Sequence, residues 1–119
     1  NLPFIYVRPD AKKHGRKNQI EGQYTSGQNV IVIEDLISTG NSSLVAVDAL
    51  READLKVKGM LSIFTYGFKV SYDNFKKNNV ELHTLSSYDT LLEQALSTNY
   101  ITDSDFQTLI KWKKDPKNW

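Results

Sequence analysis

The sequence predicts an α/β domain, a parallel β-sheet with flanking helices. Apolar strand-like segments alternate with segments of helical period along the chain, an arrangement typical of right-handed β-α-β crossovers. Residues 30–33, Val-Ile-Val-Ile, are all β-branched, as expected for a strand buried on both faces of a parallel sheet. With 119 residues, 39% of them hydrophobic and 24% charged, the chain suits one domain over residues 1–119.

Each element follows from its local pattern. Strands are expected where β-branched and aromatic residues gather, at 4–7, 29–35, 58–65 and 80–85. Helices are expected at 42–54, after a Ser71 cap as far as Asn78-Asn79, after a Ser87 cap and from near Thr102. Either Asn41 or Ser42 can cap the first helix, because each offers a side-chain oxygen to N–H groups that lack partners. Thr102 and Asp105 have the spacing of a capping box.

The basic residues are concentrated in one segment. The formal net charge is +1, yet residues 8–17 hold five basic residues against one acidic residue. The segment at about 8–22 has no apolar period, so we expect a long mobile loop of the kind that closes over active sites. One basic loop on a nearly neutral chain indicates a local anion site and not a nucleic-acid surface. No apolar run reaches the ~20 residues of a membrane span, and the absence of cysteine agrees with a cytoplasmic location.

The candidate site follows the β-branched run. Glu34 and Asp35 fall at the carboxyl end of that strand, where open α/β sheets bind ligands. Two carboxylates are acceptors that suit the vicinal hydroxyls of a ribose, whereas the turn around Gly40 offers donors to a phosphate. The acidic pair can instead cap a helix or meet surface lysines, but the small-residue turn behind it favours a phosphorylated sugar. The expected ligand contacts are Glu34, Asp35, Ser38, Thr39, Gly40, Asn41 and Ser42.

Residues 30–43 resemble the phosphoribosyl-pyrophosphate signature of type I phosphoribosyltransferases, in which four hydrophobic residues precede two acidic residues and a small-residue phosphate loop. Residues 8–15, Arg-Pro-Asp-Ala-Lys-Lys-His-Gly, with 18–22 behind them, look like the catalytic loop of orotate phosphoribosyltransferases. Segments 63–67 and 85–91 are similar to bacterial members of that group. The signature alone indicates the superfamily, and the loop indicates orotate.

The resemblance implies transfer of a phosphoribosyl group from phosphoribosyl pyrophosphate to orotate, giving orotidine 5′-monophosphate and pyrophosphate in pyrimidine biosynthesis. It implies Mg²⁺ held mainly through the donor substrate, and a homodimer whose catalytic loop is shared across subunits. Arg8, Lys12 and His14 on that loop would stabilise charge on the leaving pyrophosphate and exclude water. Asp35 completes the expected catalytic set. His14 can donate a proton to the pyrophosphate or can be a solvated loop histidine.

Some features depart from the family pattern or favour other classes. Pro9 and Asp10 occupy positions where relatives frequently carry a lysine. Some relatives have an orotate-contacting arginine at the position near Tyr66, and this chain lacks it. Family members are longer, so we expect a carboxyl-terminal portion that lacks the amino-terminal hood and has little or no activity alone. The alternatives are a transcriptional regulator with a phosphoribosyltransferase-fold sensor, which usually loses the loop features of Lys12 and His14, and a purine phosphoribosyltransferase.

Overall fold

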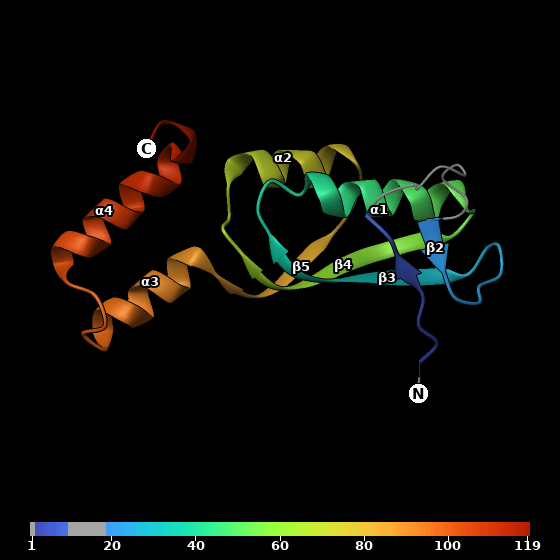
Figure 1. The fold of residues 1–119 in the computed structure, drawn as a ribbon, viewed down its shortest axis with the longest axis horizontal. Coiled ribbons are helices and arrows are strands. Elements are labelled where there is room, and N and C mark those ends of the chain that lie inside the picture. The colour runs from blue at the N-terminus through green and yellow to red at the C-terminus, as the bar shows by residue number, and fades with distance from the viewer. Residues whose placement is uncertain (1, 10–18) are drawn as a thin grey trace.

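The computed structural model describes residues 2–9 and 19–119, and its central feature is a three-stranded parallel sheet (Figure 1). The strands are β3 (Asn29–Ile37), β4 (Lys56–Thr65) and β5 (Leu82–Ser87), in that spatial order. The crossovers contain α1 (Asn41–Glu52) and α2 (Lys69–Lys77), which both lie on the same face of the sheet. The predicted parallel α/β architecture is confirmed.

The main core lies between these two helices and the sheet. Val47 of α1 and Phe75 of α2 pack with Ile37 and Met60 of the strands, and these four side chains are 0–3% exposed. Successive residues of a strand point to opposite faces, so along most of β3 every second side chain faces this core. The alternation breaks at the end of the strand, where Leu36 is exposed and Ile37 is buried in the core. We call this side of the sheet the helix-covered face.

The other side, the exposed apolar face, has no cover among the described residues. Its members are Ile31, Ile33, Leu61, Ile63 and Leu85, which are 42–85% exposed. The expectation that the run 30–33 is buried on both faces is therefore wrong for this structure. Val30 and Val32 pack on the helix side, whereas Ile31 and Ile33 point to solvent.

A small antiparallel hairpin lies beside the sheet. It pairs β1 (Tyr6–Val7) with β2 (Ile20–Glu21). The first strand is shorter than the predicted 4–7, and β2 falls within the segment 8–22 that we expected to be loop throughout. The physical reason is that Ile20 is buried against Leu50 and Leu55, which gives the chain an apolar anchor there.

Two helices form an arm at one end of the molecule (Figure 1). They are α3 (Tyr88–Ser97) and α4 (Asp103–Lys114), followed by a short 3₁₀ turn, η2 (Pro116–Asn118). The predicted caps are confirmed: Ser87 Oγ accepts from the Thr90 N–H, and Thr102 and Asp105 form the reciprocal capping box. Within the described part of the chain, no helix is both long enough and apolar enough to span a membrane.

The starts of the first two helices differ from prediction. The residue that caps α1 is Gly40, which has no side-chain oxygen, so the expected capping by Asn41 or Ser42 is wrong. In α2 the helix begins at Lys69, and Ser71 lies inside it, where its Oγ donates to the Phe68 carbonyl at 2.8 Å.

Candidate functional site

The two predicted carboxylates lie near the carboxyl end of β3, which runs to Ile37 and not only to the predicted residue 35. Successive strand side chains point to opposite faces, so Glu34 and Asp35 leave the strand on different sides. Glu34 is partly buried on the helix-covered side, and Asp35 is exposed. The structure therefore keeps both acids at the strand end, with Glu34 held against the helix-covered side and Asp35 open to solvent.

Each carboxylate has a hydrogen bond that fixes one of its oxygens. Ser43 of α1 is buried, and its Oγ donates to Glu34 Oε1 at 3.0 Å. The backbone N–H of Leu36 donates to Asp35 Oδ1 at 2.7 Å. We did not predict a role for Ser43, although it ends the run 30–43. Its hydroxyl side chain, at the end of the small-residue stretch that follows the acidic pair, is the signal that could have found it.

Residues 38–42, which we call the phosphate loop, turn from β3 into α1. Gly40 is buried and has a φ of 85°, in the left-handed region that favours glycine. A Cβ placed there would lie 2.6 Å from Cε2 of Phe75, so a larger residue would also clash. Ser38, Asn41 and Ser42 are exposed, and Thr39 is partly exposed. The loop thus presents small polar side chains at the end of the strand.

The start of α1 has the electrostatics of an anion site. The first N–H groups of a helix lack intrahelical partners, and they form the positive end of its dipole. No acidic residue lies in the first turn of this 12-residue helix to balance that charge. The phosphate loop and the two carboxylates therefore place hydrogen-bond donors and acceptors at the same edge of the sheet.

A contact from α2 reaches this loop. Asn74 Nδ2 donates to the Thr39 carbonyl at 3.2 Å and to Asn41 Oδ1 at 3.3 Å. Sequence reasoning missed Asn74 because it lies 35 residues from Thr39 and belongs to no recognisable pattern with it.

Of the three loop residues predicted to act in catalysis, Arg8 lies among the described residues, and Lys12 and His14 lie outside them. The Nε atom of Arg8 is 3.3 Å from Oε1 of Glu21, an ion pair across the hairpin. The backbone N–H of Arg8 donates to the Gln19 carbonyl at 2.8 Å, and Gln19 Nε2 donates back to the Arg8 carbonyl at 2.7 Å. The two described ends of the basic segment are therefore held against each other.

The hairpin and the phosphate loop lie at opposite ends of α1. Ile20 of the hairpin packs on Leu50, near the carboxyl end of α1, whereas Gly40 caps its amino end. A helix of 12 residues is about 18 Å long at 1.5 Å per residue. In one chain, the described ends of the basic segment thus lie far from the candidate phosphate site (Figure 1).

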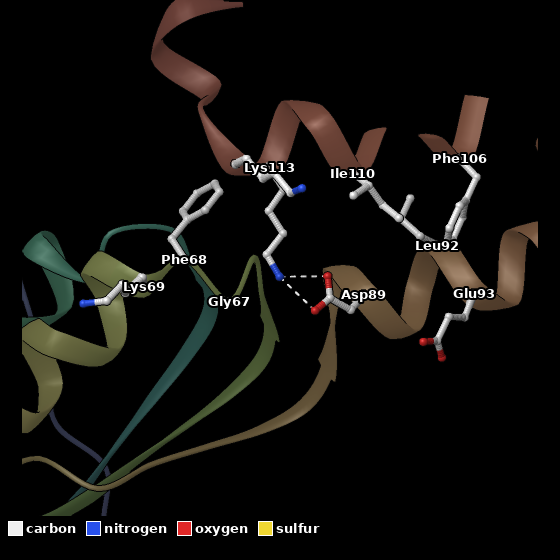
Figure 2. Close-up of a pocket in the computed structure, with 10 residues that line it drawn as sticks. Gly67, Phe68, Lys69, Asp89, Leu92, Glu93, Phe106, Ile110 and Lys113 are labelled. Carbon is white, nitrogen blue, oxygen red and sulfur yellow. Dashed lines mark hydrogen bonds and ion pairs between the residues drawn. The ribbon is translucent and has the colours of Figure 1, made fainter. Parts of the chain in front are cut away.

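A cleft of about 500 Å³ lies between the end of β4 and the two arm helices, away from the phosphate loop (Figure 2). Lys113 of α4 crosses it and donates to both carboxylate oxygens of Asp89 at 2.7 and 2.8 Å. Beside the cleft, Trp112 packs on Tyr66 and Tyr88 with ring centroids 5.5–5.8 Å apart. Burial raises the pKa of the Tyr88 phenol, with smaller contributions from nearby Tyr66 and Asp89. These contacts hold the arm against the sheet.

Carboxylates are the side chains that a hard cation such as Mg²⁺ prefers. Among the described residues, no group of three or more His, Cys, Asp or Glu side chains could hold a metal ion. Mg²⁺ commonly uses one or two protein carboxylates together with substrate phosphates. Glu34 and Asp35, the two carboxylates at this strand end, do not by themselves form such a group of three or more.

No family model matches the chain. The chain is 54% identical, over all 119 residues, to a protein of Cytophaga hutchinsonii named orotate phosphoribosyltransferase. Other bacterial relatives, at 50% to 53% identity over the same residues, carry the same name. The match falls in the carboxyl-terminal part of these relatives, and the chain spans 56% to 57% of their length.

Solved structures of proteins with related names also align with this chain. The UMP synthase of Leishmania donovani aligns with a TM-score of 0.79 and 27% identity, over 100% of this chain and 25% of that one. An orotate phosphoribosyltransferase of Mycobacterium tuberculosis, in complex with 5-phospho-α-D-ribosyl 1-diphosphate, aligns with a TM-score of 0.63 and 25% identity. That alignment covers 74% of this chain and 49% of the other.

Proposed function

We propose that this chain, homologous over its whole length to the carboxyl-terminal part of orotate phosphoribosyltransferases, holds the ribose 5-phosphate site of such an enzyme. Its three-stranded parallel sheet with flanking helices matches the type I phosphoribosyltransferase core. The observation that carries the proposal is the phosphate loop, which joins a strand end bearing Glu34 and Asp35 to the amino end of α1. The regulator and purine alternatives are not favoured, because the curated relatives at 50% to 54% identity are named for orotate.

The proposed ligand suits the charges at each part of the site. Glu34 and Asp35 would accept hydrogen bonds from the ribose hydroxyls, since ionised carboxylates only accept. Residues 38–42 would surround the 5′-phosphate with N–H and O–H donors, helped by the positive end of α1. The Ser43 hydroxyl already holds one oxygen of Glu34, so that carboxylate would meet the sugar with little loss of side-chain freedom.

The proposed reaction moves the phosphoribosyl group from phosphoribosyl pyrophosphate to orotate. The bond from the anomeric carbon to the pyrophosphate oxygen breaks, and a bond from that carbon to an orotate nitrogen forms. That nitrogen gives up its proton, which passes to the leaving pyrophosphate or to water. Negative charge gathers on the leaving pyrophosphate, where Arg8, Lys12 and His14 are the proposed stabilising groups. Mg²⁺, when bound through the donor substrate, would neutralise part of the same charge.

We also propose that the enzyme is a cytoplasmic homodimer in which the basic segment of one subunit serves the site of the other. The observation that supports this arrangement is the position of Arg8 and Gln19, the described ends of the segment. They lie by the carboxyl end of α1, about one helix length from the phosphate loop. A partner subunit can bring a second copy of the segment to that loop.

Calorimetric titration of the chain with phosphoribosyl pyrophosphate and Mg²⁺ tests the site. The unchanged chain should bind, and Asp35→Asn should weaken binding by about 10- to 150-fold, the loss of a charge-assisted hydrogen bond of about 1.5–3 kcal/mol. Asp48→Asn is the matched control, because Asp48 is an exposed acid on α1 away from the strand end. Equal affinity for Asp35→Asn and Asp48→Asn would remove Asp35 from the ribose site.

A further inference from the structure

Helix α2 contacts three successive residues of the phosphate loop, Thr39, Gly40 and Asn41. Asn74 donates one N–H of its amide to the Thr39 carbonyl and the other to Asn41 Oδ1, at 3.2 and 3.3 Å. The next residue, Phe75, is 3% exposed and places its ring against Gly40. The loop is therefore supported along one side by a helix that belongs to the following crossover.

The contact with Thr39 fixes the direction of a peptide group. In a trans peptide, the carbonyl of one residue and the N–H of the next point in opposite directions. Because Asn74 holds the Thr39 carbonyl toward α2, the N–H of Gly40 points away from α2. If this peptide turned over, a carbonyl oxygen would stand where the N–H stands and would repel an anion bound to the loop.

The hydrogen bond from Asn74 to Asn41 fixes the direction of the Asn41 side-chain amide. A primary amide has an acceptor oxygen on one side and two N–H donors on the other. Since the oxygen of Asn41 is taken by Asn74, its NH₂ group is turned away from Asn74. Asn41 is exposed, so these donors lie where a ligand can reach them.

We propose that Asn74 is a positioning residue for the phosphate site. It binds the two acceptor oxygens of Thr39 and Asn41, and so keeps the donor groups of the loop directed at the 5′-phosphate of a phosphoribosyl ligand. Asn74 does not itself touch the ligand. This inference rests on the proposed function, because it takes residues 38–42 as the part that binds phosphate.

The test compares Asn74→Ala and Asn74→Asp with the matched control Asn78→Ala. Asn78 lies at the carboxyl end of the same helix and donates its Nδ2 to the Asn74 carbonyl at 2.8 Å, away from the loop. In calorimetry with phosphoribosyl pyrophosphate and Mg²⁺, Asn74→Ala should weaken binding about 5- to 50-fold through the two lost hydrogen bonds. Asn74→Asp should weaken it further, since a carboxylate cannot donate and repels phosphate. Asn78→Ala should stay within about twofold.

A spectroscopic readout separates positioning from helix stability. Inorganic phosphate added to the ¹⁵N-labelled chain should shift the amide signal of Gly40, and Asn74→Ala should abolish that shift while Asn78→Ala keeps it. Asn74→Ala that binds like the unchanged chain would overturn the proposal. Equal weakening in Asn74→Ala and Asn78→Ala would also overturn it, because the effect would then come from the stability of α2.

The same measurement distinguishes failure of the proposed function. If phosphoribosyl pyrophosphate does not bind the unchanged chain, the proposed function fails for this chain, and the Gly40 signal with inorganic phosphate still decides the role of Asn74. A phosphate-induced shift that depends on Asn74 supports positioning. No shift at Gly40 in the unchanged chain overturns it.

Discussion

The two faces of the parallel sheet carry similar side chains in different surroundings. On the helix-covered face, Met60 is 0% exposed beneath α1 and α2, whereas Ile63, three residues along β4, is 58% exposed on the other face. Parallel sheets usually have both faces covered, and exposed apolar patches commonly mark contact surfaces. The phosphate loop is held by the two helices of the covered face, so the structure that builds the site lies on one side of the sheet.

The first prediction compares these faces directly. Met60→Ala should lower the free energy of unfolding by about 2–5 kcal/mol, because it leaves a cavity in the core. Ile63→Ala should lower it by less than about 1 kcal/mol, since the side chain already meets water. Urea denaturation monitored by tryptophan fluorescence measures both. Similar losses in the two variants would mean that the apolar face is covered in solution, for example by self-association.

The second prediction concerns Gly40, the buried glycine of the phosphate loop, which packs on the helix-covered side. Gly40→Ala should cost about 2–5 kcal/mol, since the new methyl group adds a clash with Phe75 to the strain of a positive φ. Gly27→Ala is the control, because Gly27 has a φ of 87° with nothing within 4 Å of a Cβ. It should cost only about 1–2 kcal/mol of backbone strain. If both changes cost the same, the ring of Phe75 moves freely and does not support the loop.

The third prediction has the smallest expected effect and concerns the pH dependence of Tm. It involves Asp105 in the arm, away from both faces of the sheet. The backbone and side-chain hydrogen bonds with Thr102 lower the pKa of the Asp105 carboxyl below its ordinary value of 3.8. A lowered folded-state pKa stabilises the fold above the unfolded value, and this stabilisation is lost as the pH falls below about 4. Asp105→Asn should therefore flatten the decline of Tm between pH 5 and pH 3 slightly. The same slope in Asp105→Asn and the unchanged chain would contradict this.

Local patterns predicted the parallel sheet and the small-residue turn at the end of β3. The β-branched run, the acidic pair and the small-residue turn are contiguous in sequence, so their order along the chain already places the phosphate loop at a strand end. The capping box of α4 is equally local. These predictions depend on neighbours within a few residues, where propensity and hydrogen-bonding patterns act most directly.

Features that depend on distant partners were missed. The two-residue strand β2 is anchored by the packing of Ile20 on Leu50 and Leu55, and Asn74 contacts Thr39 from 35 residues further along the chain. The left-handed Gly40 replaced the side-chain cap that we expected at the start of α1. The continuous apolar run of β3 is typical of a strand covered on both faces, and nothing within it signals that one face has no cover among the described residues.

The hydrogen bonds from Asn74 have a consequence for how this site could be transferred to another protein. A peptide that carries only β3, the phosphate loop and α1 would hold every residue expected to touch the phosphate, yet it would lack the helix that orients them. Such a loop would lose conformational entropy each time it bound a ligand, whereas the intact chain has already lost that entropy on folding. The smallest unit that keeps both the loop and its supporting helix therefore runs from β3 through α2.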